Sequence, residues 1–312
     1  VQIPENGYVN VPCCDLVMDL CGHTIYFGTS GLGLCFGAAP YTRQADYTIK
    51  NGFLAKRLWA SQMLSFINVD TVNIEDCCFY SEIEWAQNKD CNPVGVAVTY
   101  YGAQNGMTMT YNIKNCHFNE TDFQVSDRND ACACINVNMT NVVFAGSKND
   151  DGTYEYGRYS GPALEYGKDG FNYRRTYGNI SLNNVKFYVM PTNNNDAVSD
   201  KCGMVVYTGS NAAGRTTLNL NGVVYDAVTG TMGRGDHTPS MFVYAPSDYQ
   251  YVDVIEAGLN SCKINGETVN YKGIKFAARL VYDDTVAAYY STIQDAINAY
   301  ENGNNGDYTV II

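Results

Sequence analysis

Basic residues and long apolar runs are both scarce in this 312-residue sequence. Lys and Arg number 20 against 32 Asp and Glu, for a formal net charge of −12, and the only Arg pair is Arg174-Arg175. An acidic chain repels phosphate backbones, so we expect no nucleic-acid partner. No apolar run approaches the roughly 20 residues of a membrane-spanning helix, so we expect no transmembrane segment.

Helical periodicity is also missing until the C-terminal segment, and charged residues make up only 17% of the chain. Glycine and tyrosine are instead plentiful, at 29 and 26 residues. This composition is typical of β-structure with many polar turns. A chain of this length can form one large domain or two ordinary ones.

The abundant feature is a nine-residue phrase, exemplified by VNIEDCCFY at 72–80 and YNIKNCHFN at 111–119. Its first and third positions are mostly apolar, its fifth is always Gly, Asn or Asp, and its eighth is apolar. The eight copies begin at Met18, Tyr47, Val72, Tyr111, Val137, Ile180, Leu218 and Cys262.

The phrase predicts two strands joined by a tight corner. Apolar positions one and three follow the two-residue period of a half-buried strand, but position eight has the opposite parity. A corner at position five removes the conflict, because Gly, Asn and Asp tolerate a left-handed backbone. Two inward columns are therefore expected, one of Ile74, Ile113, Met139, Leu182 and Leu220 and one of Phe79, Phe118, Phe144 and Phe187.

The copies begin 25 to 44 residues apart, with no helical pattern between them. A supersecondary unit recurring at about 20–50 residues is the signature of a solenoid, here one built of strands. The longer spacings would accommodate insertions at residues 81–106, 146–177, 190–210 and 227–257.

Several phrases carry a family resemblance. LVMDLCGHTIYFG resembles the opening phrase of right-handed parallel β-helix proteins, the pectin-lyase-like superfamily, and YTIKNG resembles the phrase that commonly follows it. Asn115, Asn141 and Asn184 resemble that family's asparagine ladder. The resemblance implies an all-β, right-handed parallel β-helix with long loop insertions over residues 1–275, of the bacterial secreted or cell-surface type.

Residues 276–312 depart from the phrase. Ser291 or Thr292 can cap a helix, and Ile293, Ala296, Ile297 and Tyr300 fall at helical spacing. The final YTVII reads as a strand. This segment resembles the phrase with which many β-helix domains begin, so it is either a C-terminal cap or the start of a following module.

The twelve cysteines do not form a metal-binding pattern. Cys77, Cys116 and Cys262 stand where other copies have apolar residues, so we expect them to be free, buried thiols. The sequence does not decide whether a disulfide forms among Cys13-Cys14, Cys77-Cys78 and Cys132/Cys134. We expect neither a resident metal nor a cofactor, with a loose Ca²⁺ site at NDDGTYE as an alternative.

The insertion at 146–177 is the richest candidate site. Tyr154, Tyr156 and Tyr173 offer rings for stacking on sugars, and Glu155 and Arg174 offer hydrogen bonds to hydroxyls. The alternative is that these tyrosines pack on their own loop. We predict a secreted or cell-surface module for adhesion or carbohydrate binding, whose partner is a glycan or a host or cell-surface ligand.

An enzymatic alternative follows from the same resemblance. A polysaccharide lyase or glycoside hydrolase acting on acidic or complex glycans would use Asp150, Asp151, Glu155 and Arg174, because glycoside hydrolysis needs two carboxylates. The Gly-His-Gly phrase of such hydrolases is absent, and the histidines number three. We therefore favour a non-catalytic role.

Overall fold

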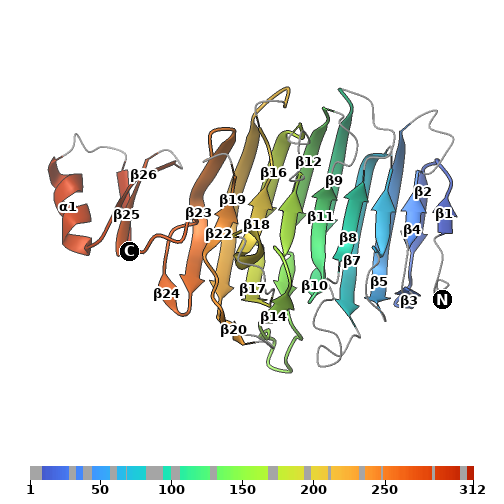
Figure 1. Cartoon of the computed structure of the whole chain (residues 1–312), viewed down its shortest axis with the longest axis horizontal. Helices are drawn as coiled ribbons and strands as arrows, with labels where there is room; N and C mark the ends of the chain where they lie inside the picture. The colour runs from blue at the N-terminus through green and yellow to red at the C-terminus, as the bar shows by residue number, and fades with distance from the viewer. Residues whose placement is uncertain are drawn as a thin grey trace.

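The computed structural model shows a mostly β chain (Figure 1). It describes residues 9–27, 33–37, 44–56, 62–67, 69–81, 94–99, 106–126, 132–167, 175–192, 198–209, 212–231, 236–246, 249–282, 285–302 and 308–312. Among these residues, no helix combines the length and apolar character that crossing a bilayer requires.

Two large sheets hold most of the described strands, and almost all of their pairings are parallel. The first sheet contains β1 (Val9–Val11), β4 (Leu34–Phe36), β6 (Leu64–Phe66), β8 (Val94–Thr99), β11 (Asp122–Ser126), β15 (Leu164–Tyr166), β18 (Cys202–Val206) and β22 (Met241–Tyr244). The second contains β2 (Leu16–Asp19), β3 (Thr24–Phe27), β5 (Ala45–Lys56), β7 (Val69–Ser81), β9 (Thr108–Lys114), β10 (His117–Asn119), β12 (Cys134–Thr140), β13 (Val143–Ala145), β14 (Gly157–Tyr159), β16 (Gly178–Asn183), β17 (Lys186–Pro191), β19 (Thr216–Ala227), β23 (Val252–Ile264) and β24 (Glu267–Thr268).

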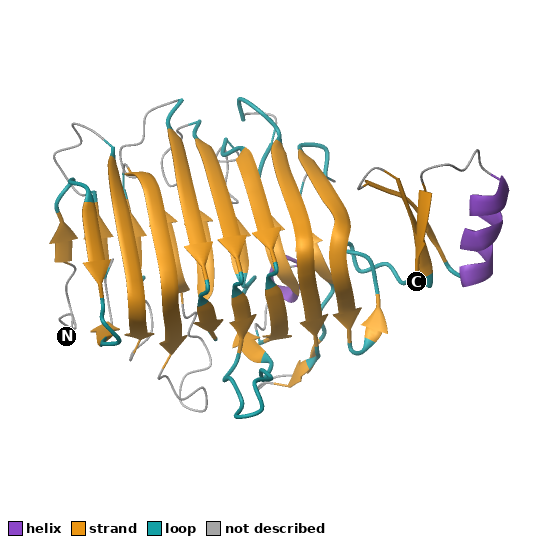
Figure 2. Cartoon of the chain, turned by 180° about the vertical axis from the view of Figure 1, so that it is seen from behind, coloured by secondary structure: helices purple, strands orange, loops and turns teal. Residues whose placement is uncertain are grey.

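The chain visits the two sheets alternately, so each return adds a strand beside the previous one. Figure 2 shows the resulting row of side-by-side strands from behind. Smaller elements complete the described structure: a 3-10 helix at Val198–Lys201, a β20–β21 pair (Gly230–Thr231 and Asp236–His237), and a C-terminal unit of β25 (Ala278–Tyr282), β26 (Thr285–Tyr290), α1 (Ile293–Asn302) and β27 (Tyr308–Ile311).

Strand β7 shows why the phrase must turn. Val72 and Ile74 are buried, and after the corner at Asp76 the buried residues are Cys77 and Phe79. Asp76 has a φ of 52°, in the left-handed region. This single residue shifts the parity of the strand, so both halves of the phrase face the same core.

Both predicted inward columns are confirmed. Ile74, Ile113, Met139, Leu182 and Leu220 are direct register partners in successive strands, and all are buried. The four phenylalanines are likewise in register, and their neighbouring rings stack with centroids 4.8 Å apart. Identical side chains thus repeat the same packing along the molecule.

The predicted asparagine ladder is also confirmed. Asn115, Asn141 and Asn184 have φ values of 53°, 55° and 53°. Asn184 Nδ2 donates to Asn141 Oδ1 at 2.8 Å, and Asn141 Nδ2 donates to Asn115 Oδ1 at 3.1 Å. Asn115 Nδ2 in turn donates to Asp76 Oδ1 at 3.0 Å, which extends the ladder onto a carboxylate.

No disulfide links any of the described cysteines. Cys77, Cys116 and Cys262 are buried as predicted. The thiols of Cys77 and Cys116 donate to the backbone carbonyls of Ile49 and Ile74, in the neighbouring strand. They therefore serve as small core residues with a weak hydrogen bond.

The C-terminal unit contains the predicted helix and strand. Thr292 caps α1, since its Oγ1 accepts a hydrogen bond from Asp295 N at 3.1 Å. Strands β26 and β27 flank β25 in an antiparallel sheet, in contrast to the parallel sheets before it. This unit lies at the opposite end of the long axis from β1 (Figure 1).

Candidate functional site

The predicted site residues lie mainly on a short hairpin between β13 and β14. Glu155 N donates to Ser147 O at 2.9 Å, and Asn149 N donates to Thr153 O at 2.9 Å. Gly152 closes the turn with a φ of 86°, which suits glycine. The insertion is thus an ordered projection over residues 147–155, attached to the edge of the second sheet.

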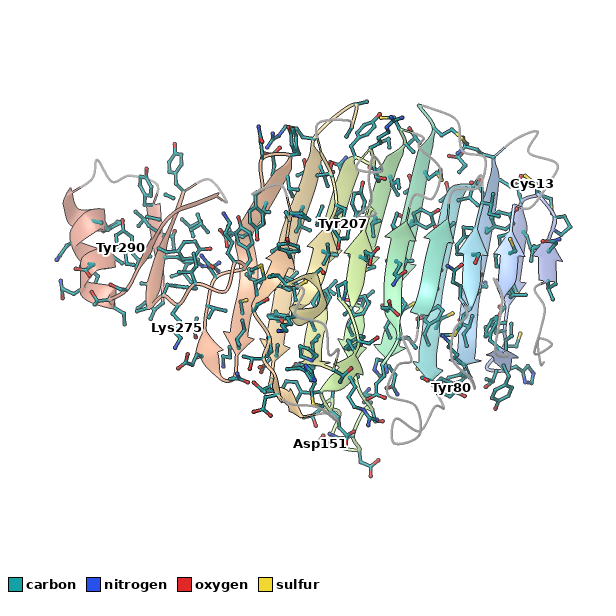
Figure 3. The ribbon with its side chains drawn as sticks, viewed as in Figure 1. Cys13, Tyr80, Asp151, Tyr207, Lys275 and Tyr290 are labelled. Atoms are coloured by element: carbon teal, nitrogen blue, oxygen red, sulfur yellow. The ribbon has the colours of Figure 1, made fainter. Side chains whose placement is uncertain are left out.

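Asp150 and Asp151 occupy the exposed tip of this hairpin. Asp151 Oδ1 accepts hydrogen bonds from Thr153 N at 2.9 Å and from Thr153 Oγ1 at 2.6 Å, and these bonds lower the pKa of Asp151. Figure 3 shows Asp151 pointing away from the body of the molecule. Its carboxylate therefore stabilises the turn.

Tyr154 points back onto the sheet instead. Its ring lies 5.1 Å from the ring of His117 in an edge-to-face contact and 6.2 Å from the ring of Tyr188. The ring of Tyr156 makes an edge-to-face contact with the ring of Tyr188, with the centroids 6.2 Å apart. The hairpin therefore rests on an aromatic surface of β10 and β17, whereas Glu155, between the two tyrosines, is exposed.

Two predicted residues, Tyr173 and Arg174, lie outside the described residues. The structure therefore brings together Tyr154 and Tyr156 from the predicted set and adds Tyr188, which the sequence did not single out.

The strands beside the hairpin present an outward column. Thr24, Phe53, Cys78 and His117 are register partners on β3, β5, β7 and β10, in that order. Phe53 is 42% exposed, which is high for a phenylalanine in the middle of a sheet. The seventh position of the phrase thus places an exposed ring three strands from the hairpin.

Between Phe53 and Tyr154 lies an open groove of about 540 Å³. Its floor follows the corner residues Asn51, Asp76 and Asn115, all of them exposed polar side chains. The full lining is Gly22, Asn51, Gly52, Phe53, Asp76, Cys77, Cys78, Asn115, His117, Lys148 and Tyr154. The groove thus has an aromatic residue at each end and amide and carboxylate groups between them.

Cys78 and His117 lie side by side in the groove as a neutral pair. His117 Nε2 donates to Gly146 O at 3.0 Å, and Nδ1 lies 3.9 Å from Cys78 Sγ. Burial, assisted by Lys148, lowers the pKa of His117 to about 4. Burial also raises the pKa of Cys78 to about 11. At neutral pH the pair is therefore thiol and imidazole, without an activated thiolate.

Among its described lining residues, the groove does not hold the carboxylate pair that glycoside hydrolysis needs. Asp76 is the one carboxylate among its described lining residues, and it already accepts a hydrogen bond from Asn115. Two catalytic carboxyl groups would have to flank the scissile bond, roughly 5–9.5 Å apart. Nor do any three His, Cys, Asp or Glu residues of the described chain cluster as a multidentate metal site.

Comparison with family models, with curated proteins and with solved structures finds no match to this chain.

Sequence reasoning located the hairpin but missed the groove. The signal lay in the seventh position of the phrase, where Phe53, Cys78 and His117 take the place of the Thr, Val or Lys of other copies. The second position carried another overlooked signal. Asn138, Asn112 and Asn73 form a second amide ladder there, with Nδ2 to Oδ1 distances of 2.9 Å at each step.

Proposed function

We propose that residues 1–275 form a right-handed parallel β-helix of the pectin-lyase-like type, with 276–312 as a separate C-terminal unit. The alternation between two parallel sheets, the in-register columns and the corner ladder support this architecture. Connections between parallel strands of one sheet are right-handed in about 98% of cases, which supports the hand.

On this architecture we propose that the chain is a secreted or cell-surface module with a non-catalytic role in adhesion or carbohydrate binding. The observation that carries the proposal is the groove with Phe53 at one end and Tyr154 at the other, above a polar floor. Sugars present C–H faces that stack on aromatic rings and hydroxyls that bind amides and carboxylates. The groove offers both kinds of group on a rigid sheet surface.

The spacing of the groove follows from the strands. Phe53 and His117 are separated by the strand of Cys78, and neighbouring strands lie about 4.8 Å apart, so about 10 Å separate Phe53 from His117. Tyr154 packs directly on His117, so it marks the end of the groove opposite Phe53. An extended oligosaccharide lying across the strands would contact both rings.

The floor can form hydrogen bonds beyond the ladder. Asn115 uses one of its two N–H donors on Asp76, and its carbonyl oxygen, which has two lone pairs, accepts from Asn141. The Asn115 amide therefore retains a donor and an acceptor for sugar hydroxyls. Such contacts are individually modest, so binding would depend on many copies acting together at a surface.

The test is a glycan array probed with the wild type, Phe53→Ala and Tyr154→Ala. A bound glycan should be lost or weakened at least tenfold in both variants. Tyr282→Ala is the matched control, because Tyr282 is 45% exposed but lies on the C-terminal sheet. Unchanged binding in both groove variants would refute the assignment.

A second assay on the same glycan distinguishes binding from cleavage. We expect no new reducing or unsaturated ends after prolonged incubation, because the described groove lacks a second carboxylate. The appearance of such ends, abolished by Asp76→Asn, would establish an enzyme in place of a binding module.

A further inference from the structure

Cys78 and His117 form a cross-strand pair whose geometry goes beyond the carbohydrate-binding role. They are direct register partners on β7 and β10, so the sheet itself fixes their separation. Both side chains face outward into the groove and neither belongs to the inward columns. The distance from Cys78 Sγ to His117 Nδ1 is 3.9 Å.

The tautomer of His117 is determined by its other nitrogen. A backbone carbonyl only accepts, so the 3.0 Å contact to Gly146 O requires a hydrogen on Nε2. The lone pair of Nδ1 is then directed toward the Cys78 sulfur. A histidine that binds a metal nearly always donates its other N–H to a carbonyl, carboxylate or water in this way.

We propose that Cys78 Sγ and His117 Nδ1 form a two-ligand site for a thiophilic d¹⁰ cation, and that this cation is Cu⁺. Soft thiolate sulfur selects Cu⁺ and Zn²⁺, and imidazole suits both. Zn²⁺ ordinarily takes three or four protein ligands. Among the described residues, no group of three or more His, Cys, Asp or Glu is placed to hold one metal ion, so the low coordination number of Cu⁺ fits this pair better.

The separation of the two atoms fits an ion between them. Metal–sulfur and metal–nitrogen bonds of about 2.3 and 2.0 Å, as for Zn²⁺, span about 4.3 Å when collinear. At a ligand separation of 3.9 Å the ion would sit in a bent arrangement, with an S–metal–N angle of about 130°. The strands need not move, and the remaining coordination positions open into the groove.

Binding is a proton-coupled ligand exchange without redox change. The Cys78 thiol loses its proton to solvent, and its sulfur and the Nδ1 lone pair of His117 displace two chelator or solvent ligands from the Cu⁺ ion. His117 keeps its Nε2–H bond to Gly146 throughout. Because burial raises the pKa of Cys78 to about 11, protons compete with copper for the sulfur. Because the pKa of His117 is lowered to about 4, protons do not compete for the imidazole at neutral pH.

The experiment is an anaerobic competition between the reduced, full-length chain and the Cu⁺ chelator bathocuproine disulfonate. We compare the wild type with Cys78→Ser and His117→Gln, whose side-chain amide can still donate to Gly146. Cys21→Ser is the matched control, because Cys21 is an exposed thiol at the corner between β2 and β3 of the same sheet. The wild type and the control should retain one more Cu⁺ per chain than the two site variants.

The fold of each variant is checked by circular dichroism, and the bound copper by X-ray absorption, which should show one sulfur and at least one nitrogen neighbour. Equal retention in the wild type, Cys78→Ser and His117→Gln overturns the proposal. So does retention of Zn²⁺ but not Cu⁺ in a parallel titration. Phe53→Ala should bind copper as the wild type does. Copper binding and glycan binding can therefore fail independently of each other.

Discussion

Phe118 stacks on Phe144 with ring centroids 4.8 Å apart and an interplanar angle of 13°. The same spacing links Phe79 to Phe118 and Phe144 to Phe187, so one contact is repeated along the molecule. Each ring is completely buried, and each inner ring is held between two neighbours. A few identical residues in this column therefore account for a large share of the buried apolar surface at this side of the core.

Replacing Phe118 by alanine should destabilise the protein by about 3–5 kcal/mol, because a cavity opens between two rings that cannot collapse together. Urea unfolding followed by circular dichroism measures the change. Phe53→Ala is the control. Because Phe53 is exposed, its replacement should lower the free energy of unfolding by less than about 1 kcal/mol. If Phe118→Ala and Phe53→Ala lost similar amounts of unfolding free energy, the stacked phenylalanine column would not be a special source of stability.

Asn141 combines two roles at its corner, a left-handed backbone and two side-chain hydrogen bonds. Asn141→Leu loses both and should cost about 1–3 kcal/mol. Asn141→Gly keeps the backbone conformation but loses the ladder, so it should cost less than the leucine variant. Unfolding midpoints of the two variants separate the contributions, and equal midpoints in both variants would show that backbone strain is negligible here.

The parts of the fold that sequence predicted are those determined by local chemistry. The inward columns follow from alternation, and the corners from residues such as Asn115 that accept a positive φ. The Thr292 cap of α1 was readable for the same reason. Each of these features depends on residues a few positions apart, so one phrase contains the whole signal.

The candidate site needed information that no single phrase holds. Phe53, Cys78 and His117 become a column only once the register of three strands is known. Tyr154 joins them only because its hairpin folds back, which depends on contacts with His117 and Tyr188. The adjacent Asp150 and Asp151 suggested a catalytic carboxylate pair in the sequence, but at the tip of a hairpin both side chains are exposed to solvent.

His117 should make stability depend on pH. Its folded-state pKa of about 4 lies below the ordinary value of 6.5, so between these values the unfolded chain binds the proton and the folded chain does not. Above about pH 6.5 the imidazole is neutral in both states and does not lower the free energy of unfolding. As the pH falls from 6.5 toward 4, protonation of the unfolded chain lowers the free energy of unfolding by as much as about 3 kcal/mol. His117→Gln should flatten the unfolding free energy over this window, and a slope equal to that of the wild type would count against the shift.

The last prediction concerns the junction with the C-terminal unit. Arg279 on β25 is buried, and its guanidinium donates to three carbonyls of β23: Glu256 O at 3.2 Å, Ala257 O at 3.3 Å and Leu259 O at 2.7 Å. The buried Glu256 carboxylate accepts from the Tyr289 hydroxyl on β26. Burial raises the pKa of Glu256, opposed by Tyr289 and by the charge of Arg279.

Arg279→Met should therefore loosen the C-terminal sheet, because it removes the donor to three carbonyls. It also removes a positive charge that favours the buried Glu256 carboxylate. Each carbonyl left buried without a donor should cost about 1–3 kcal/mol. Hydrogen exchange should show lost protection in β25, β26 and β27, while the columns of the parallel sheets stay protected. Arg215→Met is the matched control: Arg215 pairs with Asp253 at the surface, where ion pairs contribute at most about 1 kcal/mol. Unchanged protection of β25 in Arg279→Met would mean that apolar contacts alone hold the unit in place.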